Sequence, residues 1–300
     1  MCTVLTSLMA ICGCDNRASN PATTRVDNSD ESSMRIVSMA PSLTEILFKL
    51  NLGDKVVGVT NFCDYPPAAQ DKAKIGGCYD GNYEKITTLK PTLVLLLKEH
   101  EDARRKYDAL GIDYLRVDNR TLDNILGSVI DIGRRCGADK EAQALLASLQ
   151  ERIDSVRKRI ADSKSRPRTM ICIGRTMGSG QIQNVYLAGP NTIYDEILNL
   201  AGGRNAYDKK LEYPTVSAEG IIRMNPEVVI ELAADLEAKK LSRGDIRQEW
   251  QKLPQIDAVK NNRIHIFTGD YVTVPGPRIV KLLEDFADAL HPVDRTHTKP

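Results

Sequence analysis

Two matching stretches of this sequence decide its fold: Asn82-Tyr-Glu84-Lys-Ile-Thr-Thr-Leu-Lys-Pro91, which runs into Thr-Leu-Val-Leu-Leu-Leu97, and Ser217-Ala-Glu219-Gly-Ile-Ile-Arg-Met-Asn-Pro226, which runs into Glu-Val-Val-Ile-Glu-Leu232. Each begins with a helix-capping side chain, continues as a short helix, and reaches a proline that ends the helix before a buried strand. Each also carries one glutamate two residues after the cap. The repetition predicts two similar α/β lobes, and a cleft between two lobes is a common place for a ligand.

The segments around these stretches alternate between strand and helix patterns. Strands are expected at 35–40, 55–60, 93–97 and 113–117 in the first half, and at 169–173, 228–232 and 263–267 in the second. Such alternation is typical of a parallel sheet covered by helices on both faces. We therefore predict an α/β fold with two Rossmann-like lobes, each built on a central parallel sheet, at residues 34–138 and 165–292.

The segment between the predicted lobes has a different pattern. Across 139–164, apolar residues recur at helical spacing among many charged ones, which predicts one long amphipathic helix. This helix is the expected spine that joins the lobes. The alternative is an ordinary surface helix of one domain.

The composition excludes some classes of partner. Lys and Arg total 41 and Asp and Glu total 40, so the net charge is +1 and there is no basic excess for nucleic acid. Aromatic residues make up 5% of the chain, too few for a base-stacking platform. We expect no nucleic-acid partner.

The first residues do not read as part of the folded lobes. Residues 4–13 are apolar and small, and they end at Ile11-Cys12-Gly13-Cys14, which resembles a bacterial lipobox with Cys14 as the acylated residue. The usual positively charged start of a signal peptide is missing, and the alternative is a frayed apolar N-terminus. We expect a leader at 1–14, a flexible polar tether at 15–33 and a polar tail at 293–300. A lipid anchor would place the protein in the periplasm or at the cell surface.

Four cysteines lie outside the leader. Cys63 and Cys78 both sit in loop-like sequence, and in an exported protein they could form a disulfide. Cys136 and Cys172 read as small core residues. The chain has no Cys-x-x-Cys pair and no convergent His or carboxylate cluster, so we expect no metal site.

An ordered series of motifs carries a family resemblance: Asp64-Tyr65-Pro66-Pro67, Asn82-Tyr-Glu84, Ala201-Gly202-Gly203-Arg-Asn205 and Pro275-Gly-Pro-Arg278. With the lipobox and the spine helix, it resembles the helical-backbone substrate-binding proteins of ABC importers for iron complexes and vitamin B12, most of all those that bind vitamin B12. The resemblance covers about residues 34–292. It implies a monomer whose two lobes hold a large metal chelate in the cleft, with no resident cofactor and no chemistry on the ligand.

The resemblance also implies a partner. In this family an exposed glutamate on each lobe meets arginines of the membrane permease, which works with ATPase subunits. Glu84 and Glu219 stand at the matching positions, and they are the two acids of the internal repeat. The alternative is that each glutamate only favours its helix N-terminus through the helix dipole.

Ligands of open α/β lobes bind outside the carboxyl ends of the strands. The loops expected there offer six candidate contacts: Phe62, Tyr65, Tyr79, Arg175, Met177 and Tyr271. The tyrosines suit a flat macrocycle and Arg175 suits an anionic group, whereas the alternatives are loop packing and a salt bridge. His100 is the one histidine that follows a strand end. We expect cobalamin as the ligand, with haem or a ferric siderophore as alternatives.

A rival from another class is a doubly wound α/β enzyme. The sequence carries no Gly-x-Gly-x-x-Gly after its first strand, no phosphate-binding Gly-x-x-x-x-Gly-Lys motif and no Gly-x-Ser-x-Gly elbow, which argues against an enzyme. A carrier of corrinoid or haem that has no permease partner is a further alternative.

Overall fold

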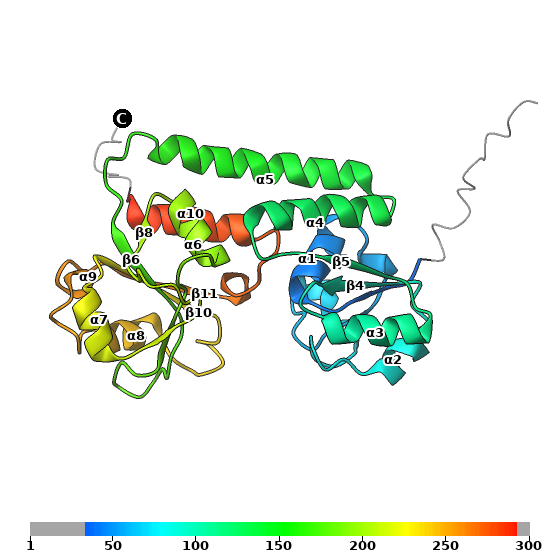
Figure 1. The fold of residues 1–300 in the computed structure, drawn as a ribbon, viewed down its shortest axis with the longest axis horizontal. Helices are drawn as coiled ribbons and strands as arrows, with labels where there is room; N and C mark the ends of the chain where they lie inside the picture. Colours follow the sequence, from blue (N-terminus) through cyan, green and yellow to red (C-terminus); the bar gives the residue numbers. More distant parts are fainter. Residues whose placement is uncertain (1–33, 293–300) are drawn as a thin grey trace, which may run out of the picture. The chain divides into compact units, whose positions relative to one another are not determined.

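The computed structural model describes residues 34–292. The predicted leader with Cys14, the tether and the tail lie outside the described residues. The described part contains two α/β lobes joined along one side by a long helix, as predicted (Figure 1). None of its helices combines the length and the apolar character that crossing a bilayer requires.

The first lobe is built on a five-stranded parallel sheet in the order β3-β2-β1-β4-β5. The strands are β1 (Ile36–Ser38), β2 (Val56–Val59), β3 (Ala73–Lys74), β4 (Leu93–Leu97) and β5 (Tyr114–Val117). The helices are α1 (Pro41–Lys49), α2 (Tyr83–Thr88), α3 (Glu101–Leu110) and α4 (Leu122–Arg135), with short 3-10 turns at η2 (Gly53–Lys55) and η3 (Pro67–Ala69). β4 is a continuous apolar run because helices cover both faces of a parallel sheet.

The second lobe has a mixed sheet in the order β11-β10-β6-β7-β9, with β8 also paired to β6. The strands are β6 (Arg168–Gly174), β7 (Val185–Leu187), β8 (Arg204–Asn205), β9 (Thr215–Val216), β10 (Val228–Ala233) and β11 (Ile264–Thr268). β10 lies between β6 and β11 in parallel register, whereas β7 and β9 pair antiparallel at one edge. The helices are α6 (Ile193–Leu200), α7 (Ala218–Met224), α8 (Arg243–Trp250), α9 (Asp257–Lys260) and α10 (Ile279–Leu290), with a 3-10 turn at η4 (Asp270–Val272).

The internal repeat has the predicted local structure in both lobes. The side chain of Asn82 accepts a hydrogen bond from the backbone N–H of Lys85 at the start of α2. Ser217 does the same for Gly220 at the start of α7. α2 leads to β4 and α7 leads to β10, and both strands lie inside their sheets. The same local sequence therefore builds the same unit twice.

The long helix α5 (Asp139–Ile160) belongs to two hydrophobic cores at once. Its first half places Ala142 in the core of the first lobe, next to Gly133 of α4, where a larger residue than glycine would collide with Ala142. Its second half places Ile153 and Val156 in the core of the second lobe, which also contains residues of α10 and α6. The helix ends at Ile160, the last large apolar residue of its stripe, and after Ala161 the chain is polar up to Pro167.

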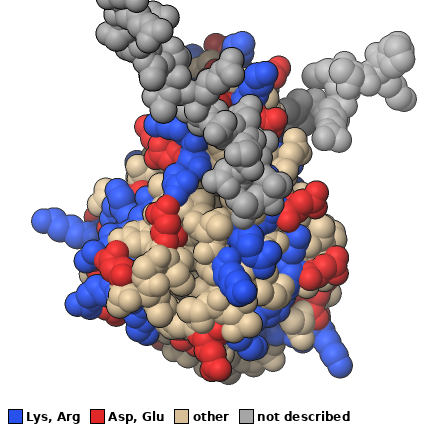
Figure 2. Space-filling model, turned by 90° about the vertical axis from the view of Figure 1, so that its right-hand side faces the viewer, with Lys and Arg blue, Asp and Glu red and all other residues tan. Residues whose placement is uncertain are grey.

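Figure 2 shows the end of the molecule nearest the first lobe, where basic and acidic side chains are interspersed. No continuous basic surface is seen on this face. The arrangement agrees with the near-neutral net charge of +1.

Replacing Ile153 by alanine tests the role of α5. The side chain is 1% exposed, so Ile153→Ala should lower the free energy of unfolding by about 2–5 kcal/mol. Ser155→Ala, on the exposed face of the same helix, is the matched control and should change it by less than about 0.5 kcal/mol. Urea unfolding of both variants gives the comparison, and equal midpoints would contradict the packing described here.

Candidate functional site

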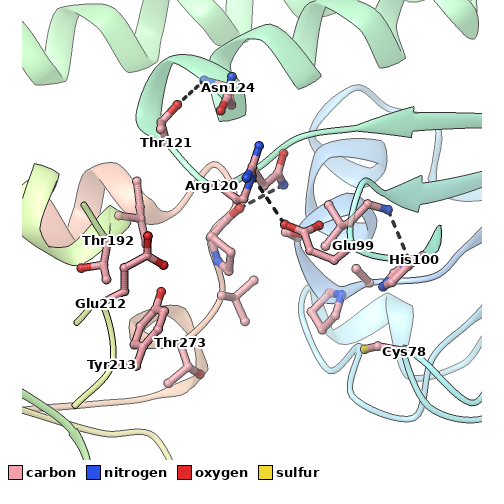
Figure 3. A pocket seen from close by; sticks show the side chains of 18 of the residues that line it. Cys78, Glu99, His100, Arg120, Thr121, Asn124, Thr192, Glu212, Tyr213 and Thr273 are labelled. Atoms are coloured by element: carbon pink, nitrogen blue, oxygen red, sulfur yellow. Dashed lines mark hydrogen bonds and ion pairs between the residues drawn. The ribbon is translucent and has the colours of Figure 1, made fainter. Parts of the chain in front are cut away.

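A cleft of about 760 Å³ lies between the two lobes (Figure 3). The first lobe lines it with residues 40–42, 78–79, 97, 99–100, 119–121 and 124, and the second lobe with residues 191–193, 212–213 and 273–275. The segments 40–42, 97–100 and 119–124 follow the carboxyl ends of β1, β4 and β5. The cleft therefore occupies the position where open α/β sheets bind ligands.

The cation in the cleft wall is already paired. Arg120 donates hydrogen bonds from Nη2 and Nε to Asp118, at 2.7 Å and 3.0 Å, and Arg120 is the one Lys or Arg among the described lining residues. The hydrogen bonds from Arg120 hold the pKa of Asp118 well below its usual range, so the pair stays ionised. The positive charge of Arg120 is thereby largely neutralised.

Two carboxylates lie on opposite walls of the cleft. Glu99 follows β4 in the first lobe, and its Oε1 is 3.9 Å from Nε of Arg120, which is an ion pair but too long for a hydrogen bond. Glu212 comes from the loop before β9 in the second lobe (Figure 3). Together they give the cleft an acidic character.

His100 forms part of the first-lobe wall beside Glu99. Its Nδ1 accepts a hydrogen bond from the backbone N–H of Leu97 at 3.3 Å, so in the neutral ring the proton is on Nε2. Burial lowers the pKa of His100, which keeps the ring neutral near pH 7. The ring of Tyr79 meets it edge-on, with centroids 5.1 Å apart. His100 is thus placed to donate a hydrogen bond into the cleft.

Polar contacts cross between the lobes beneath the cleft and at its floor. Arg278, just before α10, donates to both carboxylate oxygens of Glu45 in α1, at 2.6 Å and 3.0 Å. The side-chain amide of Asn119 donates to the backbone carbonyl of Pro275 at 3.0 Å. Burial raises the pKa of Glu45, while the hydrogen bonds and charge of Arg278 oppose that rise.

Of the six predicted ligand contacts, the structure brings Tyr79 to the cleft and places the other five elsewhere. Phe62 is exposed outside the cleft lining. The ring of Tyr65 packs under the guanidinium of Arg278, 3.8 Å from its Cζ. Tyr271 donates its hydroxyl to Asp285 at 2.6 Å. Tyr65 and Tyr271 are held by contacts within the protein that local sequence does not reveal.

The prediction that Arg175 and Met177 contact the ligand is also not supported by their positions. Arg175 is buried and donates to Glu231 at 2.8 Å and to Glu249 at 2.6 Å, and Trp250 donates to the other oxygen of Glu231. Burial raises the pKa of Glu231, and the charge of Arg175 opposes that rise. Met177 packs against the same core. This cluster is structural and lies outside the cleft lining.

The possible disulfide between Cys63 and Cys78 is not formed in the structure, where both are free thiols. Cys63 is buried, with its sulfur 3.2 Å from the hydroxyl of Thr44 and 3.1 Å from that of Thr60. Cys78 lines the cleft. Cys136 and Cys172 are buried, as predicted.

The two glutamates of the repeat are exposed at the starts of α2 and α7. Glu219 accepts hydrogen bonds from its own backbone N–H and from Ser217, which lower its pKa, so it is ionised at neutral pH. Neither glutamate lines the cleft. Their accessibility leaves both free to meet a partner.

Four residues of the cleft lining were not among the predicted ligand contacts: Glu99, Arg120, Glu212 and Tyr213. A signal existed for two of them, because Glu99 and Arg120 lie two and three residues after the predicted strands 93–97 and 113–117, and His100 lies three residues after the first. No such signal marks Glu212 and Tyr213, which lie in a loop that folds back beside the cleft. Among residues 34–292, no three His, Cys, Asp or Glu side chains converge in a way that could hold a metal ion.

Comparison with known proteins assigns the family. Residues 36–271 match the family described as periplasmic binding protein. The ABC transporter substrate-binding lipoprotein YvrC of Bacillus subtilis is 30% identical over 264 residues, which cover 86% of this chain and 80% of the relative.

Two solved structures share the fold over nearly their whole length. The periplasmic vitamin B12-binding protein BtuF of Vibrio cholerae is 25% identical, with a TM-score of 0.72 over 85% of this chain and 96% of that one. The periplasmic heme-binding protein RhuT from Roseiflexus is 25% identical, with a TM-score of 0.72 over 86% and 99%. These relatives are binding proteins, and the chain is not an enzyme.

Removing Arg175 should destabilise the second lobe. Arg175→Ala leaves Glu231 and Glu249 buried without their cation, so the free energy of unfolding should fall by about 3–5 kcal/mol. The control is Arg159→Ala, which removes an ion pair to Asp288 between more exposed side chains and should cost about 0–1 kcal/mol. Denaturant unfolding measures both, and similar losses would show that the Arg175 cluster is not structural.

Proposed function

The chain belongs to the periplasmic binding protein family that serves ABC importers of vitamin B12, haem and iron chelates, and we propose that its own ligand is a corrinoid such as cobalamin. The observation that carries the proposal is the charge of the cleft. Glu99 and Glu212 face it from opposite lobes, while Arg120 is paired with Asp118.

The chemistry of the ligands favours a corrinoid over haem. A corrin ring carries amide side chains whose N–H groups can donate to carboxylates, and its cobalt centre is cationic. Haem carries propionate carboxylates, which need free Arg or Lys side chains. The described residues that line this cleft offer Glu99 and Glu212 as acceptors and no unpaired cation.

Aromatic side chains support a flat ligand. Tyr79 from the first lobe and Tyr213 from the second both line the cleft, and 74% and 54% of their surfaces are exposed. Exposed rings on two walls offer faces to a macrocycle, and their hydroxyls can bond its periphery. Nε2–H of His100 supplies one more donor for an amide carbonyl.

Haem remains the second candidate, and the same tyrosines are the reason. A phenolate can serve as an axial ligand to haem iron, and Tyr79 and Tyr213 are both accessible in the cleft. His100 is poorly suited to that role, because the hydrogen bond from Leu97 to Nδ1 leaves the proton on Nε2. A ferric siderophore is the further alternative within the family.

We also propose that the protein is an extracytoplasmic lipoprotein and works as a monomer. Substrate-binding proteins of ABC importers work with a permease and ATPase subunits. The name of the Bacillus subtilis relative includes the word lipoprotein. On this proposal residues 1–14 form the leader, Cys14 carries the lipid, and residues 15–33 tether the domain to the membrane.

The proposed docking contacts are Glu84 and Glu219. Each is an exposed carboxylate at the start of a short helix, one on each lobe. Such charges set the register of a docked complex and speed encounter more than they add affinity. Their accessible positions support contact with arginines of the permease.

Calorimetric titration tests the ligand. Cyanocobalamin should bind one-to-one with a Kd of about 1 μM or tighter, and haemin and a ferric siderophore should bind at least about tenfold more weakly. Glu99→Gln with Glu212→Gln should weaken cobalamin binding by about tenfold or more, because charged hydrogen bonds are lost.

Glu151→Gln, an exposed carboxylate on α5 outside the cleft, is the control and should leave binding unchanged. If haemin binds more tightly than cobalamin, the corrinoid proposal is wrong and haem is the ligand to consider. If the double variant binds cobalamin as tightly as the unaltered protein, Glu99 and Glu212 do not contribute to binding.

Uptake measurements test docking. The double variant Glu84→Ala, Glu219→Ala should lower cobalamin uptake by cells about tenfold or more, with no change in ligand affinity. Asp123→Ala is a matched control, because Asp123 is exposed and follows the capping Thr121 of α4 by two residues, as each glutamate follows its cap. Unchanged uptake, or an equal effect of Asp123→Ala, would leave the glutamates with a helix-dipole role only.

A further inference from the structure

Arg278 of the second lobe is held by groups from both lobes. It donates to Glu45 of the first lobe through Nη2 and Nε, at 2.6 Å and 3.0 Å. It also donates to Asp270 of its own lobe through Nη1 and Nη2, at 2.8 Å and 2.7 Å. The ring of Tyr65, from the first lobe, lies 3.8 Å from its Cζ. The guanidinium is therefore fixed in position and orientation.

The surroundings make this contact stronger than an ordinary surface ion pair. The side chain of Glu45 is 2% exposed and that of Arg278 is 15% exposed, so little water screens the two charges. The fork of the guanidinium matches the two carboxylate oxygens, which a lysine could not do. The contact has a defined geometry and resists small displacements of the lobes.

Further contacts follow the same seam. The amide of Asn119 donates to the carbonyl of Pro275, and the backbone N–H of Leu122 donates to Glu196 at 2.9 Å. A Cβ added to Gly276 would lie 3.2 Å from Cα of Ser42, so the loop before α10 passes close to the start of α1. Ser42, Asn119 and Pro275 also line the cleft. The seam is thus the floor of the ligand site.

We propose that Arg278 acts as a strap between the lobes, which fixes the width of the cleft and so positions its two walls for the ligand. The helix α5 joins the lobes on one side. The charged bond from Arg278 to Glu45 joins them on the other side, beneath the cleft, together with the hydrogen bonds of Asn119 and Leu122. Arg278, Glu45 and Tyr65 are positioning residues, because none of them lines the cleft itself.

The strap has a thermodynamic consequence for binding. When a cleft is already held at one width, little conformational entropy is lost in ordering its walls as the ligand binds. Without the strap, part of the population has a wider cleft that does not bind the ligand. The apparent association constant is then the intrinsic one multiplied by the fraction of molecules whose cleft has the binding width. This consequence rests on the proposed function, whereas the width of the empty cleft does not.

The test measures the distance between the lobes in the ligand-free full chain. Dyes are attached through a ketone-bearing amino acid at Asp102 and Lys252, exposed positions on opposite lobes, and single-molecule energy transfer reports their separation. Glu45→Gln keeps the shape of the side chain and removes its charge, and it should broaden the distance distribution toward larger values. Arg278→Lys keeps the charge and loses the fork, and it should do the same if Glu45→Gln does not fold.

The matched control is Glu284→Gln. It breaks the bidentate pair from Arg152 to Glu284, with distances of 2.8 Å and 2.7 Å, which joins α5 to α10 away from the cleft. Its distance distribution should equal that of the unaltered protein. Tyr65→Phe retains the aromatic face under Arg278 and should also leave the distribution unchanged.

Titration with cyanocobalamin completes the test. Glu45→Gln should weaken binding by about tenfold, and Glu284→Gln should not. If cyanocobalamin fails to bind the unaltered protein, the corrinoid proposal fails while the distances still decide the strap. If the folded variants at Glu45 and Arg278 keep the unaltered distance distribution, the strap proposal is wrong.

Discussion

The arrangement of both lobes depends on one helix, α5, whose two halves belong to two different hydrophobic cores. Ala142 packs into the first lobe and Ile153 into the second, so neither core can form fully without the helix. A helix is stiff along its axis, which limits how far the lobes can move at this side. The cross-lobe bond from Arg278 to Glu45 limits them at the other side, next to the cleft. The cleft is therefore largely formed before any ligand arrives.

The charges of the structure divide into two groups. Arg120, Arg175 and Arg278 are each neutralised by carboxylates, and the last two are shielded from water. Pairing of this kind fixes side chains in place, since breaking a buried pair is costly. Glu99 forms a longer ion pair with Arg120, at 3.9 Å, and Glu212 has no ion pair among the described residues. Both carboxylates line the cleft, where a ligand can bind them.

Much of the fold could be predicted from the sequence, because local patterns determine it. The repeated cap, helix and strand at Asn82 and Ser217, and the apolar stripe of α5, need only neighbouring residues to be recognised. The site was predicted less well. Arg175 finds its partners Glu231 and Glu249 far along the chain, and Tyr65 finds Arg278 on the other lobe. Such pairings are set by tertiary packing, so local sequence did not distinguish these side chains from true cleft residues such as Glu99 and Tyr213.

A crystal structure of the protein with bound cobalamin tests the proposed site most directly. We expect the corrin ring to lie between Tyr79 and Tyr213, with its amides within hydrogen-bond distance of Glu99 and Glu212. We also expect the bond from Arg278 to Glu45 to be retained, so that the lobes have the same separation as without ligand. A ligand bound outside this cleft, or a closure that breaks the bond between Arg278 and Glu45, would contradict both proposals.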